Sequence, residues 1–180
     1  TPSHTDDDPD WWKKVRATKI WDYFDRDGVL YGQVYRFDDP TGRHKKEIRP
    51  WDGHDWKSPE STRPLYNLPA ILKAPRDATI VLVEGEKCAD AINDLRMPLI
   101  VATTIWGGAA AASRTDFSPL AGKRVLRWAD NDLPKINEKT GQPIVPAREV
   151  WLRTTLEHLT KANVASLRDV EVDPTLKDGW

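Results

Sequence analysis

The sequence of 180 residues contains one cysteine, Cys88, and only four histidines. A single cysteine excludes an intrachain disulfide and a cysteine-based zinc ribbon, and the histidines do not have the spacing of a metal site. No apolar run approaches the length of a membrane-spanning helix, and no signal-peptide pattern is present. We therefore expect a cytoplasmic protein with no membrane partner.

An excess of charge of either sign is also missing. The 27 lysines and arginines nearly balance the 28 acidic residues, which gives a net charge of −1 and no global attraction to nucleic acid. This balance weighs against a passive DNA coat, but not against an enzyme that reaches phosphates through bound cations. A Gly-x-x-x-x-Gly-Lys-Ser/Thr phosphate loop is absent as well. Any helicase or zinc-binding module would therefore belong to other parts of a longer protein or to a partner.

Composition divides the chain into three stretches. Residues 1–10 are polar and acidic, and we expect a disordered tail there. Residues 11–64 contain aromatic and β-branched runs on either side of Asp27-Gly28, a strong hairpin signal, so we expect a small β-rich subdomain. Residues 65–180 alternate between strand and helix patterns and form the main domain.

The main domain is expected to be of the α/β class. Its strands are predicted near 79–84, 99–103, 123–129 and 167–172, and its helices near 87–95, 109–113 and 147–161. Strands that alternate with helices predict a parallel sheet with helices on both faces.

Two of these strands end in carboxylates. Glu84 follows the apolar run Thr79–Val83, and Asp130 and Asp132 follow the run that ends at Trp128. In open α/β sheets, ligands bind at the carboxyl ends of the strands. Residues two apart in an extended segment face the same side, so Asp130 and Asp132 are able to face one ion. Because Mg²⁺ prefers oxygen ligands from a few carboxylates and from substrate phosphates, we predict a divalent metal site at this edge.

These motifs resemble those of the Toprim (topoisomerase-primase) domain, and most closely the Toprim domains of phage and plasmid primases or primase-helicases. The resemblance covers most of the chain. It rests on three segments: Val83-Glu84-Gly85-Glu86-Lys87 with Asp90, Thr103 to Ala109 with its glycine turn, and Leu120 to Val125 leading into Asp130-Asn131-Asp132. The β-rich segment ahead of them is similar to the one that often precedes Toprim in phage primases.

The resemblance implies roles for the matched residues. Glu84 would act as a general acid or base or as a metal ligand, and Asp130 and Asp132 would hold Mg²⁺ or Mn²⁺. Lys87 at a helix start is a candidate phosphate-binding residue, although a solvated surface position explains it equally well. Further supporting positions are Asp90, which would assist from the first helix, and Gly107 and Gly108, which would let a backbone approach closely.

The sequence departs from the Toprim pattern at two places. A polar insertion at residues 133–146 follows Asp132, where family members often continue with Gly and a helix. The chain also stops at Trp180, where relatives continue into further acidic residues, so we expect a fragment in which one late metal ligand is missing.

Several other residues have two interpretations. Lys45, Lys46 and Arg49 are interleaved with aromatic residues and are candidates, with Arg127, for contact with single-stranded nucleic acid; a lysine-protected hairpin edge is the favoured alternative. Glu86 is expected to be a solvated residue of the first helical turn. Cys88 is expected to be a small core residue rather than a nucleophile.

The function predicted from these residues is metal-dependent nucleotidyl transfer. RNA primer synthesis on a single-stranded DNA template from nucleoside triphosphates is the preferred form, as the Toprim part of a replication primase. Two alternatives remain open: a Toprim nuclease that cuts phosphodiesters with the same acids, and a non-catalytic module that binds nucleic acid or a partner.

Overall fold

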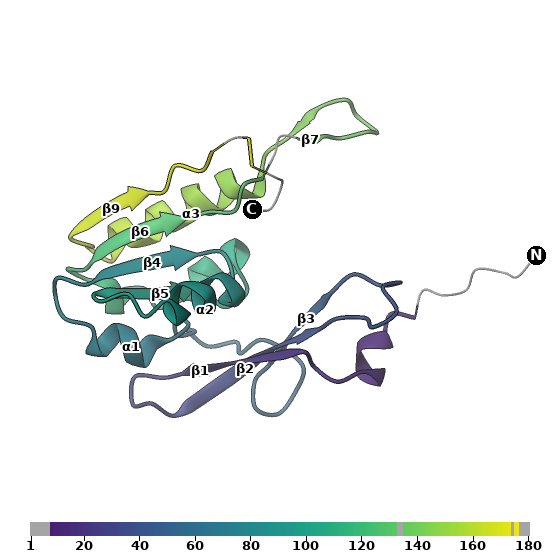
Figure 1. Cartoon of the computed structure of the whole chain (residues 1–180), viewed down its shortest axis with the longest axis horizontal. Helices are drawn as coiled ribbons and strands as arrows, with labels where there is room; N and C mark the ends of the chain where they lie inside the picture. The colour runs from purple at the N-terminus through teal and green to yellow at the C-terminus, as the bar shows by residue number, and fades with distance from the viewer. Residues whose placement is uncertain (1–7, 133–134, 174, 177–180) are drawn as a thin grey trace, which may run out of the picture.

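The computed structural model describes residues 8–132, 135–173 and 175–176. The expected disordered tail lies largely in residues 1–7, outside this range, and residues 8–10 form a turn that leads into a short 3₁₀ helix. The main chain forms a three-stranded sheet, a four-stranded sheet and a two-stranded ladder (Figure 1). None of the helices in the described part is both long and apolar enough to cross a membrane.

The N-terminal sheet is antiparallel and has the order β1-β2-β3. It follows the 3₁₀ helix η1, and the bounds are η1 Trp11–Lys14, β1 Lys19–Phe24, β2 Leu30–Phe37 and β3 Glu47–Trp51. Gly28 lies in the turn between β1 and β2 with φ of 78°, a conformation that L side chains rarely adopt. The predicted hairpin and the β-rich character of this part are therefore confirmed.

The second sheet is parallel throughout and has the order β5-β4-β6-β9. Its strands are β4 Thr79–Val83, β5 Ile100–Thr104, β6 Arg124–Trp128 and β9 Ser166–Asp169. The connecting helices are α1 Leu68–Lys73, α2 Glu86–Asp94, η2 Ala109–Arg114, η3 Ser118–Leu120 and α3 Ala147–Lys161. All four predicted strands are present, and the helix expected near 109–113 is a 3₁₀ helix.

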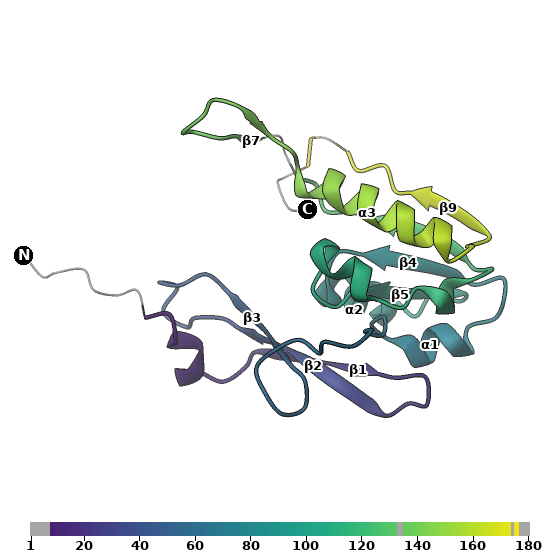
Figure 2. The ribbon, with the colours of Figure 1, turned by 180° about the vertical axis from the view of Figure 1, so that it is seen from behind.

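Two hydrophobic clusters cover the two faces of this sheet. Ile80 and Leu82 of β4 point into one cluster with Trp151 and Leu159 of α3, whereas Val81 and Val83 point into the other, with α2. A central strand that is buried on both faces is a continuous apolar run, which is the pattern seen in the sequence. Seen from behind, α3 lies across β6 and β9 (Figure 2). The predicted parallel sheet with helices on both faces is therefore confirmed.

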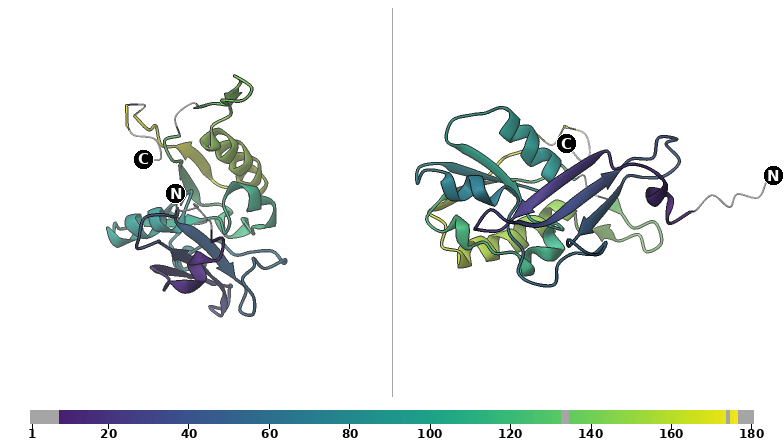
Figure 3. Two further views of the ribbon diagram at one scale, coloured as in Figure 1. Left: turned by 90° about the vertical axis from the view of Figure 1, so that its right-hand side faces the viewer. Right: turned by 90° about the horizontal axis from the view of Figure 1, so that it is seen from below.

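The N-terminal sheet packs beside α2 and the end of β5 through one aromatic cluster. Trp21, Tyr23 and Val34 from this sheet surround Trp106, which follows β5. Gly32 permits the contact, because a Cβ there would lie only 2.4 Å from Cη2 of Trp106. The view from below shows β1 and β2 crossing this side of the molecule (Figure 3). This cluster fixes the position of the two sheets relative to each other.

The segment after Asp132 forms a short hairpin. β7 Lys135–Ile136 pairs with β8 Pro143–Ile144 in an antiparallel ladder, and the side chains of both strands are exposed. In Figure 1 this hairpin projects away from the body. The insertion predicted from the sequence is therefore a surface feature with regular structure in its described part.

Candidate active site

The carboxyl ends of the neighbouring strands β4 and β6 lie at the point where the order of the strands in the sheet changes direction. The chain passes from β4 to β5 on one side and then returns past β4 to β6 on the other. Ligand sites of open α/β sheets lie at such a switch point, outside the carboxyl ends of the strands. Glu84 follows β4 directly, and Asp130 lies two residues beyond β6. Topology therefore places both carboxylates at the position where this fold binds ligands.

Glu84 and Asp130 are in direct contact. The backbone N–H of Asp130 donates a hydrogen bond to Oε1 of Glu84 at 3.0 Å. Burial raises the pKa of Glu84 to about 7, and repulsion from Asp130 and Asp132 acts in the same direction. Burial, followed by repulsion from Asp132, also raises the pKa of Asp130. Burial therefore disfavours the charged forms of both carboxyls, and the neighbouring acids add to this effect.

Asp132 has a structural contact of its own. Its Oδ2 accepts a hydrogen bond of 2.7 Å from the backbone N–H of Arg148 in the first turn of α3. Pro146 at the cap position makes no such side-chain bond, so Asp132 supplies the missing acceptor from outside the helix. A carboxylate at this end is also favoured by the helix dipole.

The donor set suits a hard divalent ion, although the acids are not arranged around one point. Within the described ranges, no three acidic, histidine or cysteine side chains are grouped so as to hold a metal as they stand. Glu84 and Asp130 nevertheless have carboxyl groups with raised pKa values, and a bound cation would favour their charged forms. Oxygen ligands of this kind fit Mg²⁺ or Mn²⁺.

A cleft of about 380 Å³ runs between the two sheets and reaches Glu84. Its walls come from the N-terminal sheet, the following loop, the strand end at Glu84 and the glycine turn after β5. The lining residues are Val34, Ile48, Pro50, Ser58, Glu84, Glu86, Ile105, Trp106, Gly107 and Gly108. Gly107 and Gly108 have φ of 87° and 68°, so this wall is formed by backbone without side chains.

The expectation that Glu86 is solvated was wrong. The hydroxyl of Tyr23 donates a 2.8 Å hydrogen bond to Oε1 of Glu86, and burial raises the pKa of this carboxyl. The N-terminal sheet thus covers the helix start that follows Glu84. The contact depends on a residue 63 positions away in the chain, so no local pattern indicates it.

Asp90 connects the two parts of the molecule. Its carboxylate accepts hydrogen bonds from Trp21 Nε1 at 2.9 Å and from the Tyr66 hydroxyl at 2.7 Å. Nζ of Lys19 lies 3.3 Å from the same carboxylate. These contacts hold the N-terminal sheet against α2, so Asp90 supports the cleft from its side.

Lys87 is exposed and lines a second groove, of about 420 Å³, between α2 and the N-terminal sheet. Lys19 and Arg36 of the N-terminal sheet line the same groove, together with Asp38, Asp90 and Asp94. Because the groove carries charges of both signs, it favours neither the phosphate-binding nor the solvated-surface interpretation of Lys87.

The basic residues of the N-terminal sheet fall into two groups. Lys45 and Lys46 are exposed, and Lys46 is close enough to the acidic edge to lower the pKa of Asp130. Arg49 is instead paired with Glu47 at 3.0 Å and lies over the Trp12 ring at 4.8 Å. Lys45 and Lys46 therefore remain candidates for contact with nucleic acid, while Arg49 is engaged in packing.

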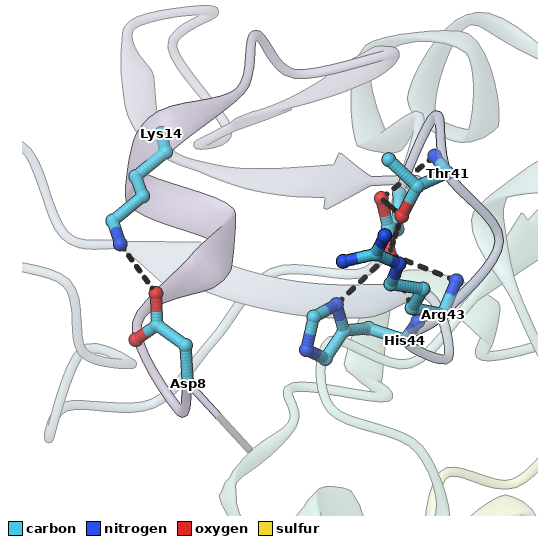
Figure 4. Close-up of polar contacts among 6 residues, drawn as sticks. Asp8, Lys14, Thr41, Arg43 and His44 are labelled. Atoms are coloured by element: carbon cyan, nitrogen blue, oxygen red, sulfur yellow. Dashed lines mark hydrogen bonds and ion pairs between the residues drawn. The ribbon is translucent and has the colours of Figure 1, made fainter. Parts of the chain in front are cut away.

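A rigid turn precedes Lys45 and Lys46. The Asp39 carboxylate accepts backbone hydrogen bonds from Thr41, Arg43 and His44, and it also bonds Nδ1 of His44. These bonds, chiefly that from the Thr41 N–H, hold the pKa of Asp39 well below its usual range. Figure 4 shows Thr41, Arg43 and His44 gathered at this turn, with the separate Asp8–Lys14 pair at the left of the view. These hydrogen bonds fix the conformation of the chain just before β3.

Arg127 is not available to nucleic acid, which corrects the expectation from the sequence. Its side chain is 4% exposed and forms two hydrogen bonds with Asp169 of the neighbouring strand, at 2.7 and 2.8 Å. It also donates to Thr155 Oγ1 at 3.0 Å and to the Leu152 carbonyl. The alternation of side chains along β6 predicts that Arg127 shares a face with Val125. It does not predict that α3 covers this face.

Cys88 is exposed rather than part of the core. It lines a hollow of about 340 Å³ with Val83, Ala91, Ile92, Trp128 and Asp130. Although the residue as a whole is exposed, partial desolvation of its thiol, followed by the negative charge of Asp130, raises the pKa of Cys88, which disfavours the reactive thiolate.

Comparison with known proteins places the fold but not the family. No protein-family model and no curated protein sequence matches the chain. Among solved structures, it is similar to one of bacteriophage T7 lagging-strand DNA polymerase interacting with primase domains of two gp4 subunits bound to an RNA/DNA hybrid and dTTP. The identity is 18%, the TM-score is 0.50, and the match covers 88% of this chain and 66% of the other.

A second similar structure is the primase fragment of the bacteriophage T7 primase-helicase protein. It has 16% identity and a TM-score of 0.48, and the match covers 89% of this chain and 54% of that one. The chain thus spans less than two thirds of either structure. It has a mixed α/β fold of the phage primase type, with a β-rich part ahead of the parallel sheet.

Proposed function

We propose that this chain is the Toprim-type catalytic part of a phage or plasmid primase. It would join ribonucleotides into a primer on a single-stranded DNA template, with Mg²⁺ or Mn²⁺ as cofactor. The proposal rests chiefly on the contact between Glu84 and Asp130 at the switch point of the sheet. The primase-type fold supports the same class of reaction. Helicase and zinc-binding modules would be supplied by other parts of the protein or by partners.

Each acid would have a defined task. Glu84, Asp130 and Asp132 would hold the metal, which supplies charge neutralisation at the reacting phosphate when it is bound. Oε1 of Glu84 is held by the Asp130 N–H, so Oε2 remains to accept the proton of the attacking hydroxyl. Its pKa of about 7 in the metal-free site would be lowered by a bound cation, which would keep Glu84 ionised and able to accept this proton at neutral pH.

The surrounding chain would orient the substrates. The cleft between the sheets ends at Glu84, and the exposed Lys46 stands on the N-terminal sheet near Asp130. Asp90, Tyr23 and Trp106 fix one sheet against the other. In phosphoryl transfer, positioning and charge neutralisation provide most of the rate enhancement.

Primer synthesis is tested with a single-stranded template, labelled ribonucleotides and Mg²⁺ or Mn²⁺. Short products that disappear in Glu84→Gln and Asp130→Asn, but persist in the exposed-site control Asp77→Asn, are expected. Template degradation without synthesis would instead identify a nuclease that uses the same acids. Template binding without either product, unchanged in Asp130→Asn, would identify a non-catalytic module. The same assay in a longer protein that carries the remaining primase modules separates an inactive site from a missing module.

A further inference from the structure

An apolar hollow of about 340 Å³ lies beside the acidic cluster, on the face of the sheet that α2 covers. Val83 and Trp128, which are neighbours at the carboxyl ends of β4 and β6, line it from the sheet. Cys88 and Ile92 are four residues apart on one face of α2 and line it from the helix. Asp130, a candidate metal ligand, lines the same hollow. A ligand held at Asp130 therefore has apolar surface directly next to it.

Trp128 contributes an aromatic ring that is only partly covered. Its side chain is half-buried and packs against the cluster that contains Val81 and Val83. α2 packs against β4 and β5, and no other aromatic ring in the described part of the chain contacts the ring of Trp128. A flat apolar group is able to cover such a ring, as nucleobases do when they stack on aromatic side chains.

The surroundings of the hollow carry charge that suits a phosphate group. Lys46 and Lys87 are exposed, and neither forms an ion pair with another of the described residues. Desolvation is the largest influence on the pKa of the Cys88 thiol and raises it, whereas Lys87 and Lys46 act in the opposite direction. Lys46 also acts to lower the pKa of Asp130. Positive charge therefore lies near an apolar interior, which complements a ligand with an aromatic base and a phosphate tail.

The hollow suits one base rather than a strand. Its volume of about 340 Å³ lies at the lower end of the range of about 300–1,000 Å³ that is typical of small-molecule sites. Among the described residues that line it, Trp128 is the one aromatic side chain. Proteins that bind single strands instead stack successive bases on several aromatic side chains.

We propose that this hollow binds the base of the ribonucleoside triphosphate, stacked on Trp128, with the phosphates directed toward Asp130. The site deepens the proposed function, on which it rests, because it assigns the nucleotide base to a place separate from the cleft between the two sheets. Trp128 and Ile92 would supply apolar contact, and Lys46 and Lys87 would attract the phosphates.

Alkylation of Cys88 reports on occupation of the hollow. Cys88 is the only cysteine of the chain and is exposed, so a neutral reagent such as iodoacetamide labels one known position. The full chain is labelled in Mg²⁺ with ATP, with inorganic tripolyphosphate or with oligo-deoxythymidylate, and mass spectrometry gives the rate relative to the same protein without ligand.

Three variants separate the aromatic ring from general effects. Trp128→Leu removes the ring and keeps apolar volume, and Trp128→Phe keeps a smaller ring. Trp56→Leu is the control, at a tryptophan after β3 that is 42% exposed. Thermal unfolding reports whether each variant is folded, and the comparison of ATP with tripolyphosphate on the wild type needs no variant.

ATP is expected to slow the alkylation of Cys88, and tripolyphosphate is expected to leave it unchanged. In Trp128→Leu, the ATP concentration that halves the rate is expected to rise by about tenfold or more, as for the loss of one base–aromatic stack. Trp128→Phe should be intermediate, and Trp56→Leu should behave like the wild type.

Three results would overturn the proposal: equal protection by tripolyphosphate, protection by the oligonucleotide but not by ATP, and unchanged ATP protection in folded Trp128→Leu. Absence of any protection by ATP would overturn it as well. Electron paramagnetic resonance of Mn²⁺ with the same protein shows whether the acidic cluster binds metal, so a failure of the base site is distinguished from a failure of the proposed function.

Discussion

Replacing Glu84 by glutamine tests whether the negative charge of this carboxylate destabilises the folded protein. Glutamine keeps the oxygen that accepts the Asp130 N–H, so the fold is preserved while the charge is removed. Burial and the neighbouring acids raise the pKa of Glu84 from 4.5 to about 7. A carboxyl with a raised pKa stabilises the folded state fully below pH 4.5, and this contribution is lost as the pH rises through 7.

The magnitude follows from the size of the shift. A shift of this size corresponds to at most about 3.5 kcal/mol at about 1.4 kcal/mol per pH unit, and solvent screening of the half-exposed side chain reduces it to about 1–2 kcal/mol. At pH 8 without metal, we therefore expect Glu84→Gln to have a higher free energy of unfolding than the wild type by about 1–2 kcal/mol. Below the unfolded-state pKa, we expect this gain to disappear.

Urea denaturation in EDTA at pH 4 and pH 8 measures this difference. Glu138→Gln, at an exposed position in the β7–β8 hairpin, removes one carboxylate without touching the cluster and serves as the control. If Glu84→Gln and the wild type differed by the same amount at both pH values, the raised pKa of Glu84, attributed chiefly to its burial, would be refuted.

Two further substitutions test the connection between the sheets. Asp90→Ala removes the acceptor for Trp21 and Tyr66, and we expect urea denaturation to show a loss of about 2–3 kcal/mol in the free energy of unfolding; a loss within error would contradict the role of Asp90 as a link. Gly32→Ala places a Cβ 2.4 Å from Trp106, and a loss of about 1–3 kcal/mol is expected from overpacking, whereas an unchanged melting temperature would show that the contact relaxes freely.

The sequence predicted the central sheet because its signal is local. The run Thr79–Val83 is apolar throughout, as a strand buried on both faces must be, and a helix-forming segment follows it directly. The same pattern located Glu84 and Asp130 at strand ends, and parallel strands bring such ends to one edge. Their contact is therefore a consequence of topology that is readable before the structure.

The remaining features depend on contacts between distant segments. Glu86 looks like a solvated residue of a first helical turn until Tyr23 covers it. In the sequence, Arg127 resembles a solvent-exposed residue of a strand with alternating polar and apolar side chains. In the structure, Asp169 and α3 enclose it. The periodicity of residues in the sequence indicates which side chains share a face of a helix or strand. It does not indicate which distant segment packs against that face.

The proposed function requires Glu84, Asp130 and Asp132 to hold one metal ion, and Mn²⁺ binding tests this requirement most directly. In a titration followed by electron paramagnetic resonance, the wild type is expected to bind Mn²⁺, and Asp130→Asn is expected to weaken binding by about tenfold or more, as for the loss of a charged ligand. Asp77→Asn, at an exposed position before β4 on the opposite edge of the sheet, should bind like the wild type. Equal Mn²⁺ binding in wild type and Asp130→Asn, or no binding in either, would contradict the account.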